Sequence, residues 1–312
     1  MKQKQVFSRT RLSKGRRAIA YILVAAVLVV AAAAYVATRM MSGGEETVAA
    51  LATETHFHGL AVDAKDPSRL YLATHHGLFV VDPAGRAQLV SDSRDDFMGF
   101  TPHPGDPAIL YASGHPAGGG NTGFTVSDDG GQSWRKLAEG AGGPVDFHQM
   151  DVSKADPKVI YGVYGDIQKS TDGGQSWTVV AAIPQGLIDL AAGSRPEMLY
   201  AATQQGLLRS TDDGKSWKPV YQSRQPVTMV EVTREGAIYA FVTGTGLVQA
   251  DEQSLNWKVL GGGFGGQYVL HFAVAASNSR RLYAITIDPA DRSQSLFTSA
   301  DGGESWTTLA TP

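Results

Sequence analysis

The stretch SDDGGQSW at residues 127–134 decides the fold, because its pattern returns along the chain. The pattern Ser-x-Asp-x-Gly-x-Ser-Trp recurs at residues 170–177, 210–217 and 299–306, and a degenerate copy that keeps the Trp spans residues 250–257. All five Trp residues of the chain fall in this pattern, at spacings of 43, 40, 40 and 49 residues. A period of this size predicts a propeller or a similar array of repeated units.

Each full copy of the pattern predicts a tight turn between two antiparallel strands; we call these four segments the repeat turns. The Asp can fold its carboxylate back onto backbone N–H groups, and the Gly supplies a backbone conformation that side chains resist. The Trp covers the turn and is expected to find a partner for its ring N–H. Because these polar groups are used locally, we predict a structural role for Asp129, Trp134, Asp172, Trp177, Asp212, Trp217, Asp301 and Trp306.

The residues around each turn indicate four short strands per unit. An apolar strand comes first, as at residues 59–62, and a Tyr marks the second strand. The third strand is short and apolar, as at residues 77–80, and the fourth begins at the Trp. Six units are marked in this way, at Tyr71, Tyr111, Tyr161, Tyr200, Tyr239 and Tyr283. We therefore predict an all-β fold, a six-bladed β-propeller with four-stranded blades, over residues 51–312.

An uncharged apolar stretch, residues 18–38, precedes the repeats. As a helix it would be about 31 Å long, close to the thickness of the hydrocarbon core of a bilayer. Seven basic residues precede it, which places the N-terminus in the cytoplasm. We predict a basic cytoplasmic tail at 1–17, one transmembrane helix at 18–38 and a linker at 39–50. The propeller then lies on the periplasmic or extracellular side of the cell membrane; a cleaved signal peptide, the alternative, would export it too.

Charge and composition exclude several kinds of function. Residues 1–46 hold eight of the 27 basic and two of the 30 acidic residues, so residues 47–312 carry a net charge of −9. An acidic body argues against nucleic acid as a partner, because nucleic-acid binding needs a basic surface. The chain has no Cys, which excludes disulfides, thiolate metal sites and an anchor attached through Cys.

The four repeat turns make residues 50–312 resemble the Asp-box (BNR-repeat) β-propellers, which include sialidases, sortilin-type receptors and photosystem II assembly propellers. The segments HFHGLAVD (56–63) and YLATHHGLFVVD (71–82) also resemble exported bacterial propellers that are often labelled glycosylhydrolases. The resemblance implies the fold, and a fold does not by itself give a function. Sialidases hold a carboxylate with three Arg residues. In the body of this chain the Arg residues are scattered and none opens a first strand, so we do not expect sialidase activity.

The order of strands sorts the loops into two ends of the propeller. The repeat turns lie at one end, and the turns between second and third strands lie at the other, where the mouth of the central channel is expected to bind ligands. His271, in the first strand of the sixth unit, is expected beside the first unit, and His103 is expected at the end of the repeat turns. The predicted ligand-binding residues at the mouth are His56, His58, His75, His76, His115 and His148.

A metal site is one interpretation of these imidazoles. His56 and His58 are two apart on a strand, so they face the same way, about 6.6 Å apart. Together with His148 from a neighbouring strand they could bind one transition-metal ion, Cu or Zn. Met98, at the matching position of the second unit, would favour copper. The alternative is that the His residues only hydrogen-bond neighbouring blades and that Met98 belongs to the core.

Two functions from different classes stay open. The sequence has no visible nucleophile–base–acid arrangement, which favours a binding or assembly module whose mouth binds a metal, a peptide, or a protein or glycan partner. The alternative is an extracytoplasmic glycoside hydrolase, which needs two carboxylates about 5–10 Å apart. Asp95, Asp96, Asp146 and Glu54 are the candidates at the mouth, and their competing interpretation is solvated loop acids.

Overall fold

The computed structural model describes residues 46–261 and 264–310, all within one compact unit that begins at Glu46. The predicted cytoplasmic tail and transmembrane helix lie outside the described residues. Within the described part of the chain, no helix combines the length and the apolar character that crossing a bilayer requires.

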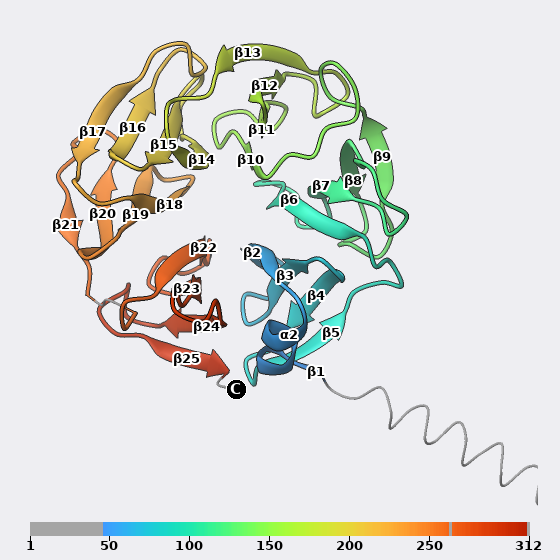
Figure 1. Cartoon of the computed structure of the whole chain (residues 1–312), viewed down its shortest axis with the longest axis horizontal. Helices are drawn as coiled ribbons and strands as arrows, with labels where there is room; N and C mark the ends of the chain where they lie inside the picture. Colours follow the sequence, from blue (N-terminus) through green and yellow to red (C-terminus); the bar gives the residue numbers. More distant parts are fainter. Residues whose placement is uncertain (1–45, 262–263, 311–312) are drawn as a thin grey trace, which may run out of the picture. The chain divides into compact units, whose positions relative to one another are not determined.

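Six antiparallel sheets stand around a central axis like the blades of a propeller (Figure 1). The first three blades are formed by β2 (Phe57–Val62), β3 (Leu70–Thr74), β4 (Gly77–Val81) and β5 (Arg86–Leu89); by β6 (Asp96–Pro102), β7 (Leu110–His115), β8 (Phe124–Ser127) and β9 (Arg135–Ala138); and by β10 (Gln149–Val152), β11 (Ile160–Tyr164), β12 (Asp166–Ser170) and β13 (Thr178–Ala182).

The other three blades repeat this order. They are formed by β14 (Leu187–Ala192), β15 (Leu199–Thr203), β16 (Gly206–Ser210) and β17 (Lys218–Gln222); by β18 (Val227–Val232), β19 (Ala237–Val242), β20 (Gly246–Asp251) and β21 (Lys258–Val259); and by β22 (Tyr268–Val274), β23 (Leu282–Ile287), β24 (Gln294–Ser299) and β25 (Thr307–Ala310). The predicted six blades of four strands are confirmed.

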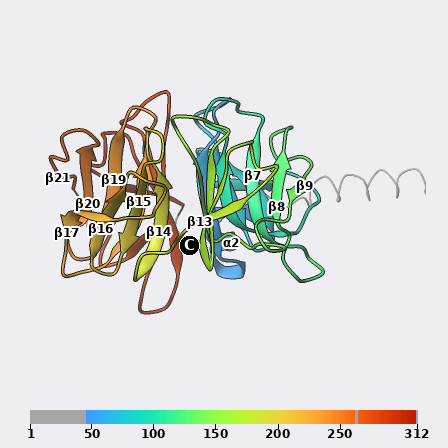
Figure 2. The same ribbon diagram turned by 90° about the horizontal axis from the view of Figure 1, so that it is seen from above.

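The first strand of each blade is the innermost, and these six strands contact one another around the axis. Figure 2 shows that the strands run through the thickness of the ring, so their ends are exposed on its two faces. The apolar core lies between the blades, where each sheet packs against the next, as Phe124, Phe147 and Trp177 do between the second and third blades. The channel side chains are therefore set by the inner strands.

A short helix precedes the first blade, α2 (Val48–Glu54), together with a two-residue strand, β1 (Glu46–Thr47), that pairs with β5. The helix and β1 thus lie across the predicted boundary between the linker, 39–50, and the propeller, 51–312. Thr47 caps the helix by accepting the Ala50 N–H at 3.1 Å. Val48 and Leu51 are buried between the first and last blades, and this tertiary burial stabilises a helix that is too short to form alone.

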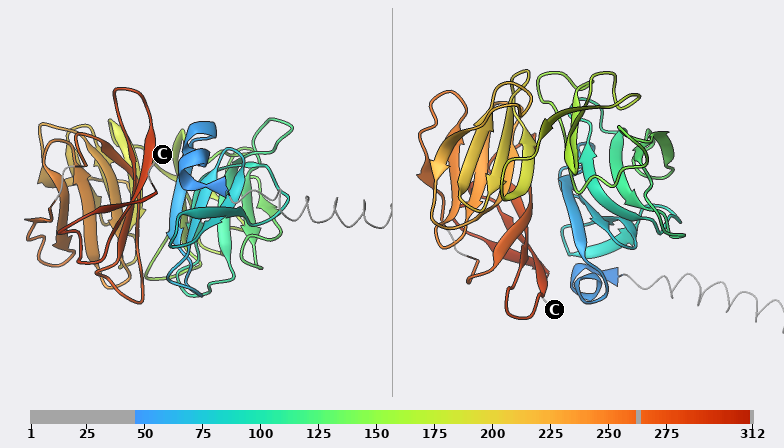
Figure 3. Two further views of the ribbon diagram at one scale, coloured as in Figure 1. Left: turned by 90° about the horizontal axis from the view of Figure 1, so that it is seen from below. Right: turned by 45° about the horizontal axis from the view of Figure 1, so that its top comes forward.

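The ring closes at the junction of the first and last blades without a shared strand in the described residues (Figures 1 and 3). The Phe57 N–H donates to Gln294 Oε1 at 3.1 Å, and His271 Nε2 bonds the Phe57 carbonyl at 3.1 Å. Helix α2 contacts β24 on the same junction. These contacts hold the first and last blades together in place of a strand shared between the two termini.

The repeat turns contain the predicted hydrogen bonds. In the first turn the backbone N–H and the hydroxyl of Ser133 donate to the Asp129 carboxylate at 2.9 and 2.6 Å, and the Ser127 hydroxyl donates at 2.8 Å. These bonds, those from Ser133 above all, lower the pKa of Asp129 to about 2. The carboxylate is fully used inside the turn, as a structural role requires.

The Trp residues fulfil the prediction only in part. The ring N–H groups of Trp134 and Trp177 donate to backbone carbonyls of their own turns at 3.2 and 3.1 Å. Those of Trp217 and Trp306 are buried and have no partner among the described residues, so the predicted partner is absent there. Nothing in the structure explains this difference between the turns.

Candidate functional site

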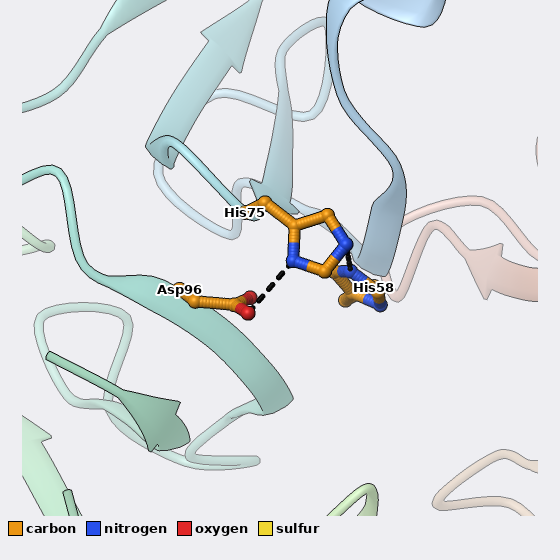
Figure 4. A group of neighbouring side chains, drawn as sticks. All are labelled: His58, His75 and Asp96. Carbon is orange, nitrogen blue, oxygen red and sulfur yellow. Dashed lines mark hydrogen bonds and ion pairs between the residues drawn. The ribbon is translucent and has the colours of Figure 1, made fainter. Parts of the chain in front are cut away.

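Three side chains from two blades meet at the channel mouth (Figure 4). His58 lies on β2, His75 in the turn between β3 and β4, and Asp96 at the start of β6 in the next blade. His58 Nε2 lies 3.0 Å from His75 Nε2, and His75 Nδ1 lies 2.7 Å from Asp96 Oδ2. We call this group the rim cluster. The two imidazoles come from the same blade, and packing of the next blade adds Asp96.

More imidazoles surround the rim cluster. The His56 ring centre lies 6.5 Å from that of His58 and 5.7 Å from that of His75. Burial lowers the pKa of His58 to about 3, and the neighbouring His75, His271, His56 and His148 add to this. His58 is therefore neutral at any physiological pH and keeps a nitrogen lone pair.

A second carboxylate–imidazole group lies at the start of the third blade. His148 Nε2 is 2.7 Å and His115 Nε2 is 3.2 Å from Asp146 Oδ2. The hydrogen bond to Asp146 raises the pKa of His148 above its ordinary value. The Oδ1 atoms of Asp146 and Asp96 are both buried without a hydrogen-bond partner among the described residues, which is unusual for carboxylate oxygens.

The remaining predicted site residues lie apart from these groups. Asp95 is used locally, because its carboxylate accepts the Ala117 N–H at 3.1 Å and the Ser93 hydroxyl at 3.0 Å. His76 and Glu54 are exposed, and Met98 is buried with the core. His148, one of the three predicted metal ligands, faces Asp146, whereas His58 faces His75.

A cavity of about 880 Å³ fills the centre of the ring and is lined by the inner strands of all six blades. It extends from His58 and His148 at the mouth to Pro104 and Pro107 near the opposite end. One continuous space therefore connects the two ends of the channel, and residues along its whole length line the cavity.

Three acidic residues on neighbouring inner strands line this cavity: Asp151 on β10, Asp189 on β14 and Glu231 on β18. We call them the channel acids. Lys154 bonds Asp151 through its ammonium group at 2.6 and 2.7 Å. Because one ammonium group faces three carboxyl groups in a buried place, not all of them can be ionised at low cost.

Two of the channel acids also join blades. Asp151 Oδ2 accepts the Ala192 N–H from the next inner strand at 2.8 Å, and Asp189 Oδ2 accepts the Val230 N–H at 2.9 Å. The carboxyl of Glu231 makes no such bond within the described residues. Glu231 is thus the channel acid with its polar atoms open to the cavity.

The pKa values of two channel acids are strongly raised. Burial raises the pKa of Glu231 to about 8, against the lowering effect of Lys154 and with the help of Asp151 and Asp189. Burial also raises that of Asp189 to about 7. A neutral carboxyl group beside an ionised carboxylate in one cavity is typical of sites for general acid–base catalysis.

The channel acids were not identified from the sequence, where only His residues and acidic residues expected in loops were singled out. The available signal was an acidic residue inside an otherwise apolar first strand, as in QMDV, LIDLAA and VTMVEV. Such a residue must either pair with something or face the channel.

No family model matches the chain. An oligoxyloglucan-reducing end-specific xyloglucanase from Emericella nidulans is 25% identical over 311 residues, an alignment that covers 87% of this chain and 36% of that protein. Among solved structures, the GH74 enzyme of Niastella koreensis superposes with a TM-score of 0.57 at 15% identity. The GH74 xyloglucanase of Xanthomonas campestris superposes with a TM-score of 0.54 at 19% identity. Each superposition covers 81% of this chain and 45% of the chain of the solved enzyme.

The chain is therefore a six-bladed β-propeller that is similar in sequence to a xyloglucanase and similar in fold to GH74 enzymes. It spans about a third of the curated relative and less than half of each of the two solved enzymes. At these identities the solved structures establish the fold alone.

Proposed function

We propose that this propeller is an extracytoplasmic glycoside hydrolase that acts at its channel. Three facts support the proposal: the xyloglucanase relative, the cavity along the axis, and the channel acids inside it. The single observation that carries it is Glu231, whose carboxyl faces the cavity unbonded and stays protonated near neutral pH. The tether of residues 18–38 would hold the domain at the outer face of the membrane.

The chemistry follows from the two raised pKa values. Burial raises the pKa of Glu231 to about 8 and that of Asp189 to about 7, so both carboxyl groups can exchange protons near neutral pH. Glu231 can then donate a proton to the glycosidic oxygen, and Asp189 can accept one from the attacking water. Lys154 bonds Asp151, and the Asp151 carboxylate favours the protonated form of Glu231.

The predicted rim carboxylates give the competing assignment. Asp96 and Asp146 each leave one oxygen without a partner, and they stand on neighbouring blades at the mouth. Each, however, holds an imidazole at 2.7 Å, which orients that ring and occupies the carboxylate. We therefore place the acid–base pair in the channel.

The test is a reducing-end assay on the full-length chain in detergent, with xyloglucan oligosaccharides and other β-glucans as substrates. Glu231→Gln and Asp189→Asn should each lower kcat by about 10²–10⁴-fold, the usual contribution of a general acid or base. Activity should fall as the pH rises through about 8, because the acid then loses its proton. Glu235→Gln is the matched control, since Glu235 is exposed in the turn that follows the same strand.

Two results would reject this assignment. A folded wild-type chain that cleaves none of the glycans would remove the hydrolase and leave the binding module. Full activity in Glu231→Gln with loss in Asp146→Asn would move the reaction to the rim. The binding module is the second candidate, and the imidazoles of the rim are the observation in its favour.

A further inference from the structure

The hydrogen bonds of the rim cluster decide which nitrogen of His75 carries its proton. Nδ1 faces the Asp96 carboxylate at 2.7 Å, and a carboxylate only accepts, so Nδ1 holds the hydrogen. In the neutral ring Nε2 then has a lone pair, and it points at His58 Nε2, 3.0 Å away. A carboxylate behind an imidazole in this way is the usual support of a metal-binding His.

His58 supplies the second lone pair. Its ring is partly buried among other imidazoles, and its Nε2 lies 3.0 Å from His75 Nε2. A neutral ring is the form that binds a metal ion. Two ring nitrogens therefore converge on one point at the channel mouth.

The separation of the two nitrogens fits one ion between them. With metal–nitrogen bonds of about 2.0–2.1 Å, a 3.0 Å separation subtends an angle of about 95° at the ion. An angle near 90° belongs to the tetragonal geometry that Cu²⁺ prefers, and the affinity order of divalent metals also places Cu²⁺ highest. Zn²⁺ would need the rings to open by about 0.4 Å for a tetrahedral angle.

We propose that His58 and His75 bind one divalent transition-metal ion through their Nε2 atoms, Cu²⁺ in preference to Zn²⁺, with Asp96 fixing the His75 ring from behind. The His56 ring lies beside both, with its centre 6.5 Å from that of His58 and 5.7 Å from that of His75. The His75 side chain is 40% exposed, so solvent reaches the site, and water or an anion can complete the coordination of the ion.

The alternative is a plain hydrogen bond between the two rings. That bond would satisfy both nitrogens, yet it would leave Asp96 Oδ1 buried without a partner. A metal cation bound by the two rings places a positive charge near this oxygen and attracts it. The inference does not depend on the hydrolase, because its readout is metal binding and not activity.

The experiment is a titration of the full-length, EDTA-treated chain with CuSO₄ or ZnCl₂, followed by calorimetry and, for copper, electron paramagnetic resonance. We expect one equivalent of Cu²⁺, a spectrum split by two or more nitrogens, and tighter binding than Zn²⁺. His58→Ala and His75→Ala should weaken binding at least about 100-fold, and Asp96→Asn about 10–100-fold, as removal of an outer partner does.

His76→Ala is the matched control, since His76 is the exposed neighbour of His75 in the same turn. It should bind copper as the wild type does. Circular dichroism and thermal melts in EDTA check that each variant is folded, and His75→Gln replaces His75→Ala if that variant unfolds. The absence of saturable copper or zinc binding would overturn the proposal, as would unchanged affinity in folded His58 and His75 variants.

Discussion

Burial in a shared cavity governs the charge of individual side chains at the residue scale. Burial raises the pKa of Glu231 to about 8 and that of Asp189 to about 7, whereas hydrogen bonds lower that of Asp129, in the first repeat turn, to about 2. Asp129 receives three hydrogen bonds inside its turn, while Glu231 receives none within the described residues. The same kind of group is thus structural on the surface and titratable in the channel.

The channel acids should make stability fall as the pH rises above 6.5. Their folded-state pKa values of about 7 and about 8 exceed the ordinary values of 3.8 and 4.5, so the folded chain binds protons that the unfolded chain has released. This stabilisation is complete below about pH 4 and is lost as the pH rises through 7 and 8. Below pH 6.5 the buried His58 and His271 act in the opposite direction, because their folded-state pKa values are lowered to about 3 and about 4.

From pH 6.5 to 8.5 the unfolding free energy in EDTA should therefore decrease by on the order of 1 kcal/mol per pH unit. Urea unfolding at several pH values measures it. Glu231→Gln should flatten the decrease and Glu235→Gln should not. A wild-type stability that rises over this range would contradict the assigned protonation of the channel acids.

At the scale of elements, each repeat turn also packs on the preceding blade. The Gly before the last three residues of the turn comes so close to a third-strand side chain of that blade that a Cβ would collide or crowd against it. The contacts are Gly131 with Leu78, Gly174 with Phe124, Gly214 with Ile167 and Gly303 with Leu247. The turn thus connects strands within one blade and blades with each other.

Two adjacent glycines test this packing. Gly173 and Gly174 both have positive φ, 74° and 90°. A Cβ at Gly173 meets open space, whereas one at Gly174 would lie 2.0 Å from a ring carbon of Phe124. We expect Gly173→Ala to cost about 1 kcal/mol for the backbone alone, and Gly174→Ala about 2–4 kcal/mol once overpacking is added.

Urea denaturation of the two variants gives the comparison. Equal losses would mean that the turn does not press on the neighbouring blade and that only backbone strain matters.

At the scale of the whole molecule, the ring depends on the junction of its first and last blades. Leu51 of α2 packs in one apolar cluster with Phe57 of the first blade and with Tyr283, Ile285 and Leu296 of the last. Other neighbouring blades are linked by continuous chain, but this pair is linked by side chains and a few hydrogen bonds. Closure of the ring therefore depends on these contacts.

Leu51→Ala should destabilise the fold by about 2–5 kcal/mol, the usual cost of a cavity in place of a buried Leu. Leu51 is only 2% exposed. Thr53→Ala, on the exposed side of the same helix, should change the stability little. Urea unfolding and limited proteolysis at the junction measure both. An unchanged Leu51→Ala stability would show that the helix does not take part in closure.

The blades were predictable and the site only in part. The recurring Trp and Tyr residues identify the units because each unit must bury the same faces of its sheet. The repeat turns are predictable because their polar groups bond one another within eight residues. The end of the ring that carries His58, His75 and Asp96 followed from strand order, but the contact of His75 with Asp96 required knowledge of how two blades pack. The channel acids were not predicted from the sequence, because their burial in one cavity depends on how the inner strands are arranged around the axis.

By itself, the sequence determined the number of blades, their strands and the repeat turns, because these depend on contacts between residues close along the chain. The tertiary structure alone decided three other features: closure of the ring by residues 48–54, the meeting of His58 with His75 across a turn, and the gathering of Asp151, Asp189 and Glu231 in one cavity. The first and third features involve residues of different blades, up to more than two hundred positions apart, so only the relative placement of whole blades brings them within reach of one another. The second depends on how the strands of one blade pair.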